Sequence, residues 1–254
     1  MARALMLPPA FVRTGRPLIW AHRGASFDAP ENTLAAFDQA LRQGADGVEL
    51  DVQRCGSGEV VVLHDSSLGR TTGFAGLVAE TSLERLRSLD AGARTAARFR
   101  GERVPLLREV LEGFPLLVNI ELKSEEMDDR GLTAAAVSEV LEAGAASRVL
   151  FSSFNPLCLL RARWLLPHVP RALLFESSQG WPLRSASTAR LVGACALHPE
   201  ARLATPRRAA RWRRRGYSVA CWTVDDVADA ERLFASGVEA IITNRPDVLR
   251  ARWP

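Results

Sequence analysis

Residues 47–65 read GVELDVQRCGSGEVVVLHD, and this stretch decides the fold. Two segments in it, Gly47–Gln53 and Glu59–Asp65, are rich in β-branched residues and are expected strands. Only Arg54–Gly58 separates them, which is far too short for the crossover that joins two parallel strands. The stretch therefore predicts an antiparallel hairpin that turns at its glycines.

Outside this stretch, short apolar runs alternate with helical segments along the chain. The other expected strands are Leu18–Arg23, Leu117–Lys123, Val149–Phe154, Arg171–Phe175, Ala194–His198, Ser218–Val224 and Glu239–Thr243. The expected helices between strands, with apolar residues at i, i+3 and i+4, are Thr33–Gln43, Gly131–Ala143, Pro156–Leu165, Ala186–Gly193, Pro206–Arg215 and Asp226–Ser236. This alternation predicts a parallel sheet covered by helices.

The number of strands indicates the architecture. Nine strands are expected, but the returning hairpin strand, Glu59–Asp65, cannot belong to the parallel set. Eight strands remain, and they predict an α/β fold: a (β/α)₈ TIM barrel with a β-hairpin and a small insertion after the second barrel strand. We expect a single domain over residues 1–254, whose insertion at about 66–114 carries short helices at Leu83–Leu89 and Leu106–Leu111.

The composition excludes several classes of protein. Of the 254 residues, 47% are hydrophobic and 24% charged, which excludes a disordered or fibrous chain. The four cysteines form no C-x-x-C pair, which argues against a disulfide scaffold and a cysteine zinc site. Prolines interrupt the N-terminal apolar run, and no apolar stretch is long enough to cross a membrane, so we expect a cytoplasmic protein with no transmembrane segment.

Charged residues gather where the expected strands end. These residues are His22, Arg23, Glu49, Asp51, His64, Asp65, Glu121 and Lys123. Residues i and i+2 of a strand share a face, so Glu49 lies on the face of Asp51, and Glu121 on that of Lys123. A two-residue hairpin turn would place His64 on the face of Glu49 and Asp51, whereas a three-residue turn would place Asp65 there.

Three carboxylates at the mouth of a barrel would repel one another unless a cation lies between them. An all-oxygen set of Glu49, Asp51 and Glu121 favours one divalent cation, Mg²⁺ or Ca²⁺ with Mn²⁺ as a further option, over zinc. Two histidines can move protons near neutral pH, and Arg23 and Lys123 can neutralise an anion. Lys123 is the only lysine among 33 basic residues. Together these groups suit phosphoryl chemistry.

Each of these signals also has a structural interpretation. His22 alone is more often a hydrogen-bonded structural residue, and Glu121 and Lys123 alone favour a salt bridge. We expect His168 to lie in a surface loop and His198 to be structural. The helix at Arg207–Arg215 could bind nucleic acid or an anionic membrane, but the solvated outer face of a barrel helix is favoured.

Five motifs in the N-terminal half carry a resemblance to a known family. They are Ala21-His-Arg-Gly24, Ala29-Pro-Glu-Asn-Thr33, Glu49-Leu-Asp51, Leu63-His-Asp65 and Leu68-Gly-Arg-Thr-Thr72. The match continues through Asn119-Ile-Glu-Leu-Lys123, Ser152-Ser-Phe154, Cys221-Trp-Thr-Val224 and Ile242-Thr-Asn-Arg-Pro246. From about Leu18 to Asp247, the chain resembles the glycerophosphodiester phosphodiesterase family, in particular its short cytosolic bacterial members.

The resemblance implies roles for individual residues. It implies metal ligation by Glu49, Asp51 and Glu121, acid–base catalysis by the pair His22 and His64, and phosphate binding by Arg23 and Lys123. Phe154 and Trp222 match aromatic positions near the substrate glycerol, although barrel-mouth packing would explain them equally well. Many members carry aspartate where this chain has Asn244, which is not a proposed ligand.

The expected activity is metal-dependent hydrolysis of a small-molecule glycerophosphodiester to glycerol 3-phosphate and an alcohol. The alternatives are a lysophospholipase D-type or other phosphodiesterase on the same barrel, and a non-catalytic protein that binds a phosphate ligand. The complete set of two histidines and three carboxylates argues against the non-catalytic alternative. No specific nucleic-acid partner is expected, and neither the preferred alcohol nor the oligomeric state follows from the sequence.

Overall fold

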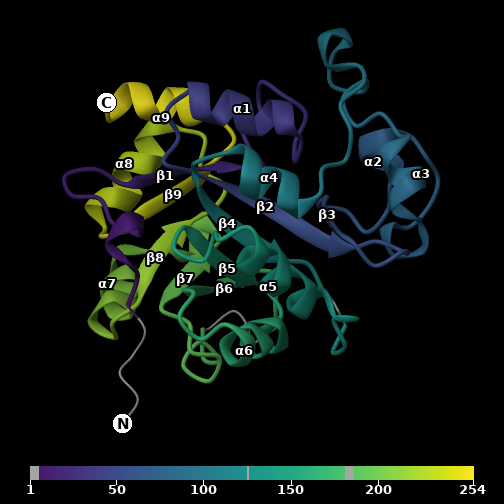
Figure 1. Ribbon diagram of the computed structural model, residues 1–254. Coiled ribbons are helices and arrows are strands. Elements are labelled where there is room, and N and C mark those ends of the chain that lie inside the picture. Colours follow the sequence, from purple (N-terminus) through teal and green to yellow (C-terminus); the bar gives the residue numbers. More distant parts are fainter. Residues whose placement is uncertain (1–5, 125, 181–185) are drawn as a thin grey trace.

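The computed structural model describes residues 6–124, 126–180 and 186–254, and its centre is a closed barrel (Figure 1). The barrel strands are β1 (Leu18–His22), β2 (Gly47–Arg54), β4 (Leu117–Leu122), β5 (Val149–Ser153), β6 (Arg171–Phe175), β7 (Ala196–Pro199), β8 (Ser218–Cys221) and β9 (Ala240–Thr243). Every neighbouring pair is parallel, and pairing of β1 with both β2 and β9 closes the ring. The predicted (β/α)₈ barrel is confirmed.

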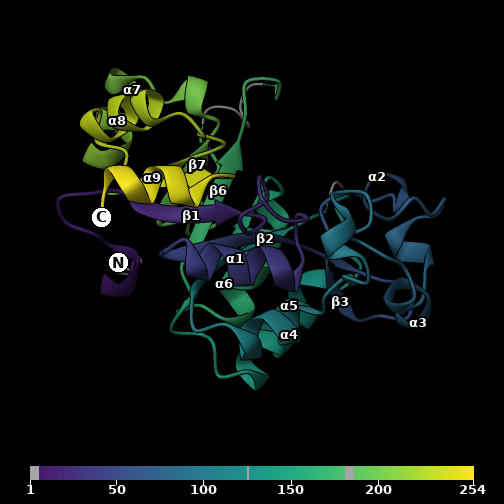
Figure 2. The ribbon, with the colours of Figure 1, turned by 90° about the horizontal axis from the view of Figure 1, so that it is seen from above.

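Helices cover the outside of the barrel, as the two ribbon views show (Figures 1 and 2). They are α1 (Leu34–Arg42), α4 (Leu107–Gly113), α5 (Leu132–Glu142), α6 (Pro156–Leu165), α7 (Pro206–Arg214), α8 (Val227–Ala235) and α9 (Pro246–Arg252). Several of these helices begin at a residue whose side chain accepts a hydrogen bond from a backbone N–H of the first turn. Examples are Thr33 at α1 and Asp226 at α8.

One predicted helix is wrong. The segment 186–193 forms a run of turns, in which Ala189, Leu191 and Gly193 donate to carbonyls three residues earlier rather than four. The C-terminal helix α9 was not among the predicted helices, although Pro246 at its first turn is a typical start signal. Short helices are easily misjudged from periodicity alone, because a turn or two supplies few apolar positions.

The hairpin between β2 and β3 (Val60–Val62) is antiparallel as predicted, and of the two turn lengths considered the structure has the three-residue one. Gln53 pairs with Val61 and Arg54 with Val60, and the N–H of Cys55 then bonds to the carbonyl of Glu59, which leaves a three-residue turn at 56–58. By alternation alone this register would put Asp65, not His64, on the inner face. The strand ends at Val62, however, and the Gln53 side chain binds the carbonyls of residues 63–65 and redirects the chain.

The segment that follows the hairpin stands beside the barrel at the end of β3 (Figure 2). It contains α2 (Gly69–Thr72), α3 (Leu83–Arg87) and the 3-10 helices η2 (Val78–Glu80) and η3 (Ala97–Phe99). Its apolar side chains Leu68, Val78, Leu86, Ala91 and Val104 pack with Cys55, Val61 and Leu63 of the hairpin into a small core. We call residues 66–105 the insertion; that it and the barrel form one domain over residues 1–254 stays a prediction.

The interior of the barrel changes character along its axis. The lower part is apolar and holds Trp20, Leu117, Leu150, Ala196 and Ile242. The upper part, two residues further along several of the same strands, holds charged and polar side chains. Because alternate residues of a barrel strand point inward, residues of this upper layer share one space at the C-terminal mouth.

Two observations concern the exterior. In α7 the side chains of Ala209 and Trp212 are buried and the arginines are exposed, a pattern that a solvated outer face and a basic binding face share. Among the described residues, no helix is both long and apolar enough to cross a bilayer.

Candidate active site

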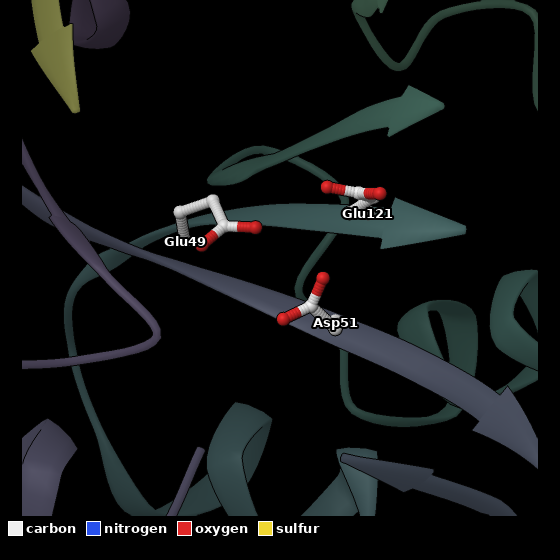
Figure 3. A group of neighbouring side chains, drawn as sticks. All are labelled: Glu49, Asp51 and Glu121. Atoms are coloured by element: carbon white, nitrogen blue, oxygen red, sulfur yellow. The ribbon is translucent and has the colours of Figure 1, made fainter. Parts of the chain in front are cut away.

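Three buried carboxylates meet at the mouth of the barrel. Glu49 and Asp51 project from β2 and Glu121 from β4, and their carboxylates point toward one another (Figure 3). The register pairs Asp51 with Glu121, so the two side chains leave adjacent strands side by side. One oxygen from each residue lies within 4.8 Å of the others, as ligands of a single ion would.

The electrostatics of this triad fit a bound cation. Burial, together with the charges of Asp51 and Glu121, raises the pKa of Glu49 well above its usual range. Burial and the charge of Asp51 raise the pKa of Glu121 to about 7. Repulsion of this kind is relieved by a hard divalent ion, and the donor set contains only oxygen. The residues present therefore fit Mg²⁺, Ca²⁺ or Mn²⁺.

Two cationic side chains flank the triad. Arg23 Nε lies 3.3 Å from Asp51 Oδ2, and Lys123 Nζ lies 3.0 Å from Glu121 Oε1 and 3.8 Å from Asp51 Oδ1. Burial opposes the charge on Lys123, but Glu121 and Asp51 raise its pKa above the ordinary value, so the ammonium stays charged. Both cations are partly exposed, and both can turn toward an anion that binds above the carboxylates.

The backbone around Arg23 is shaped to bring it into the site. Arg23 has φ of 58°, a left-handed conformation that is costly for a non-glycine residue, and its N–H donates to Glu49 Oε2 at 3.0 Å. Gly24 follows with φ of 80°, and a Cβ there would lie 2.6 Å from the Cβ of Ala36. The His-Arg-Gly order thus lets the end of β1 turn tightly against α1.

His22 is held by a neutral partner. Its Nδ1 lies 2.7 Å from Asn244 Oδ1, while the Asn244 amide nitrogen donates to Asp225 at 2.8 Å. Since the amide oxygen faces His22, the imidazole proton is on Nδ1 and Nε2 keeps a free lone pair, 4.0 Å from Glu49 Oε2. Burial and the charge of Arg23 lower the pKa of His22 to about 4, so the ring is neutral near pH 7.

His64 is held by a charged partner. Its Nδ1 donates to Asp65 Oδ1 at 2.7 Å, and its Nε2 accepts from Lys123 Nζ at 3.2 Å. A hydrogen bond from Arg70 lowers the pKa of Asp65 to about 2, so the carboxylate is ionised. His64 thus has an anionic partner on Nδ1, whereas the partner of His22 on Nδ1 is a neutral amide.

The aromatic residues Phe154 and Trp222 lie together above the triad. Their rings are edge to face with centroids 5.6 Å apart, and Trp222 Nε1 donates to the carbonyl of His198 at 2.8 Å. Both rings line a groove of about 910 Å³ that runs from His64, Glu121 and Lys123 past the hairpin tip. Every site residue expected from the sequence is thus found at this mouth.

The other two histidines do not line the groove. His198 follows the inward-facing Ala196 by two residues and is buried, and burial lowers its pKa to about 3, whereas His168 is exposed in a loop.

The sequence did not identify the residues that support the site. Asn32 donates to Asp51 Oδ2 at 2.9 Å and accepts from the Asp51 N–H, and Asn244 with Asp225 orients His22. Asn32 belongs to the Ala29-Pro-Glu-Asn-Thr33 motif, whose last residue, Thr33, caps α1. The motif was therefore visible, but its contact with Asp51 depends on tertiary folding.

Comparison with known proteins agrees with this geometry. Residues 22–248 match the model of the glycerophosphoryl diester phosphodiesterase family. A glycerophosphodiester phosphodiesterase of Caldanaerobacter subterraneus is 38% identical over 237 residues, which cover 92% of this chain and 96% of that protein.

Solved structures show the same similarity. A phosphodiesterase from Oleispira antarctica, in complex with the product sn-glycerol-3-phosphate, superimposes with a TM-score of 0.82 at 30% identity, over 93% of this chain and 96% of that one. A glycerophosphodiester phosphodiesterase from Agrobacterium tumefaciens gives a TM-score of 0.77 at 30% identity, over 92% and 99%.

Proposed function

The chain belongs to the glycerophosphoryl diester phosphodiesterase family and is a phosphoric diester hydrolase, and from this premise we propose how its residues divide the reaction. The substrate is a glycerophosphodiester, and the products are glycerol 3-phosphate and an alcohol. The observation that carries the proposal is the juxtaposition, at one barrel mouth, of the carboxylate triad, two cations and two differently held histidines.

Glu49, Asp51 and Glu121 hold the divalent cation, for which we propose Mg²⁺ or Ca²⁺. When bound, this ion supplies charge neutralisation for the phosphate oxygens. Arg23 and Lys123 add positive charge to the same anion, and this charge is worth most in the transition state, where a further bond to phosphorus concentrates negative charge. Phe154 and Trp222 cover the glycerol end of the substrate.

The two histidines move the protons. His22 Nε2, unprotonated and buried, takes the proton of the attacking oxygen as its bond to phosphorus forms. His64, oriented by Asp65 through Nδ1, gives a proton from Nε2 to the alcohol oxygen as its bond to phosphorus breaks. Before this transfer Lys123 leaves His64 Nε2 for the bound phosphate, and Nε2 takes up a proton from solvent. The proton balance is the same whether water or the substrate's own glycerol hydroxyl attacks.

The groove has a mixed lining. Beyond the aromatic pair its walls carry Arg54, Ser57, Glu126, Asp128 and Arg130 together with Leu77, Ala79 and Leu132, so the lining alone does not separate a small polar alcohol from a lipid. We place a glycerophosphodiester ahead of a lysophospholipid substrate because of the family match and the relatives of that name. The free, buried cysteines accord with the cytoplasmic location predicted from the sequence, and that location stays a prediction.

The direct test is release of glycerol 3-phosphate from glycerophosphocholine, measured with Mg²⁺, Ca²⁺ or Mn²⁺ and after exhaustive chelation. We expect turnover with at least one of these ions and none in chelator. Lysophosphatidylcholine, assayed in parallel, should be cleaved at least tenfold more slowly. No release with any of the three ions, or an undiminished rate without metal, would contradict the proposal.

A further inference from the structure

Arg70, which lies outside the barrel on α2 of the insertion, binds two carboxylates at once. Its Nη1 and Nη2 each lie 2.7 Å from an oxygen of Glu31, and its Nε lies 2.5 Å from Asp65 Oδ2. A two-pronged guanidinium–carboxylate contact fixes orientation as well as charge, which a single ion pair does not. Both carboxylates belong to other elements: Glu31 precedes α1, and Asp65 follows β3.

Each of these carboxylates holds a group of the reaction site with its remaining contacts. Asp65 Oδ1 accepts from His64 Nδ1 at 2.7 Å, and Glu31 Oε1 accepts from Arg23 Nη1 at 3.0 Å. A single carboxylate residue therefore links Arg70 to His64, the proposed proton donor, and another links it to Arg23, a proposed phosphate-binding cation. Among the described residues of the insertion, Arg70 is the side chain that contacts both the carboxylate bound to His64 and the carboxylate bound to Arg23.

The contacts close into a ring. From Arg23 the path continues to Asp51 at 3.3 Å, and from His64 it continues to Lys123 at 3.2 Å. Lys123 in turn lies 3.8 Å from Asp51 Oδ1. A displacement of the Arg70 guanidinium would thus change the positions of both Arg23 and His64, the groups that flank the phosphate position.

Stability alone does not account for this arrangement. The Arg70 side chain is 50% exposed, so water screens its ion pairs, although a two-pronged contact within a network is the case in which such pairs do contribute to folding. Its backbone is nevertheless held firmly, because Leu68, just before α2, is fully buried in the core of the insertion and Thr72 Oγ1 donates to its carbonyl. The insertion therefore supports a half-exposed arginine at a defined place beside the barrel mouth.

We propose that Arg70 is a positioning residue of the phosphodiester site: through Asp65 it orients the imidazole of His64, and through Glu31 it orients the guanidinium of Arg23. The small core of the insertion is then part of the catalytic apparatus, because it holds Arg70 at the barrel mouth. This inference rests on the proposed function, and it assigns to the Leu68-Gly-Arg-Thr-Thr72 stretch a task that the reaction scheme leaves unassigned.

The test compares Arg70→Gln and Arg70→Lys with Arg94→Gln, an exposed arginine of the same insertion. We expect Arg70→Gln to lower kcat on glycerophosphocholine by about 10–100-fold, the loss typical when a residue supporting an active group is removed. Lysine can satisfy one carboxylate but not both, so Arg70→Lys should lie between glutamine and wild type. Arg94→Gln should match wild type.

Three further measurements separate positioning from general damage. An activated nitrophenyl diester needs little proton donation to its leaving group, so it should recover the part of the kcat loss in Arg70→Gln that comes through His64, while the part that comes through Arg23 should remain. Combining Arg70→Gln with Asp65→Asn should cost far less than the product of the two separate losses, because both changes act on His64. The His64 Nδ1–H signal, assigned in ¹⁵N-histidine-labelled protein by its loss in His64→Ala, should be sharp in wild type and broadened in Arg70→Gln.

Wild-type kcat and KM in Arg70→Gln, equal losses on both substrates, or multiplicative losses in the double variant would each overturn the inference. An unchanged His64 signal in Arg70→Gln would also overturn it. If wild type releases no glycerol 3-phosphate, the proposed function fails instead, and the NMR comparison still decides whether Arg70 orients His64.

Discussion

Strand β2 has an acidic residue just before it and two more at its middle, where it reaches the barrel mouth, and the two sites are built in opposite ways. Just before the strand, Asp46 is a single carboxylate among arginines: Arg16 lies at 2.6 Å, Arg13 at 3.1 Å and Arg250 at 3.4 Å. The Ile19 N–H donates to it as well. Although burial opposes ionisation, the bond to Arg16 and the other donors lower the pKa of Asp46 to about 2.

At the barrel mouth, Glu49 and Asp51 face Glu121, and fewer cations than carboxylates lie close by. Arg23 and Lys123 lower the pKa of Asp51 in spite of its burial, but Glu49 and Glu121 have raised pKa values. The floor of the barrel thus completes its charge pairing by folding alone, whereas the mouth needs a ligand to complete it. The comparison teaches that the floor serves stability and that the mouth gives up stability for binding.

The largest expected effect comes from removing one charge at the mouth. Glu49→Gln should reduce turnover to background, because the metal loses a ligand. The same change should raise the melting temperature of the chelated protein, since it removes repulsion among buried carboxylates. Mg²⁺ or Ca²⁺ at about 100 times its Kd should stabilise wild type by about 2.7 kcal/mol and should leave the variant unchanged.

Differential scanning fluorimetry, with and without chelator, measures both effects. A lower melting temperature for chelated Glu49→Gln than for chelated wild type would contradict the contrast between the Asp46 site at the floor and the carboxylates at the mouth. Metal stabilisation of the variant equal to that of wild type would remove Glu49 from the ligand set.

The next effect concerns the two histidines of the mouth. His22→Ala and His64→Ala should each lower kcat on glycerophosphocholine by about 10²–10⁴-fold, and exposed His168→Ala should not. If the neutral Asn244 and the charged Asp65 assign base and acid as proposed, a nitrophenyl diester should rescue His64→Ala only. Steady-state kinetics on both substrates decide this, and equal rescue of both variants, or rescue of neither, would refute the division of labour.

The smallest expected effect lies at the floor. Asp46→Asn should lower the free energy of unfolding at pH 7 by about 1–2 kcal/mol, less than its pKa shift alone would give because the arginines are partly exposed. The folded-state pKa is below the unfolded value of about 3.9, so this stabilisation is complete above roughly pH 5 and is lost as the pH falls toward 2.

Urea unfolding in chelator at several pH values tests this linkage. The wild-type and Asp46→Asn curves should converge near pH 2, and kcat/KM at pH 7 should be unaltered. A constant difference between them across the acid range would show that Asp46 contributes through packing rather than through its charge.

Much of the site could be read from strand periodicity. The i, i+2 pairs Glu49–Asp51 and Glu121–Lys123 predicted shared faces, and both pairs do lie on the inner wall. The same periodicity could not decide between His64 and Asp65, because alternation holds only while a strand lasts, and β3 ends at Val62. The side chain that redirects the chain after Val62 belongs to Gln53, on the facing strand, and no local pattern announces such a contact.

The sequence by itself determined the eight-stranded barrel, the hairpin and the identity of the groups that meet at the mouth. These follow from short-range rules: the period of apolar residues, the length of a turn and the face on which a side chain lies. Only the tertiary structure decided which partner each group has, such as Asn244 at His22, Asp65 at His64 and Arg70 behind Asp65. The reason is physical: hydrogen-bond partners are set by side-chain directions and distances between segments up to 222 residues apart, which the closure of the barrel brings together.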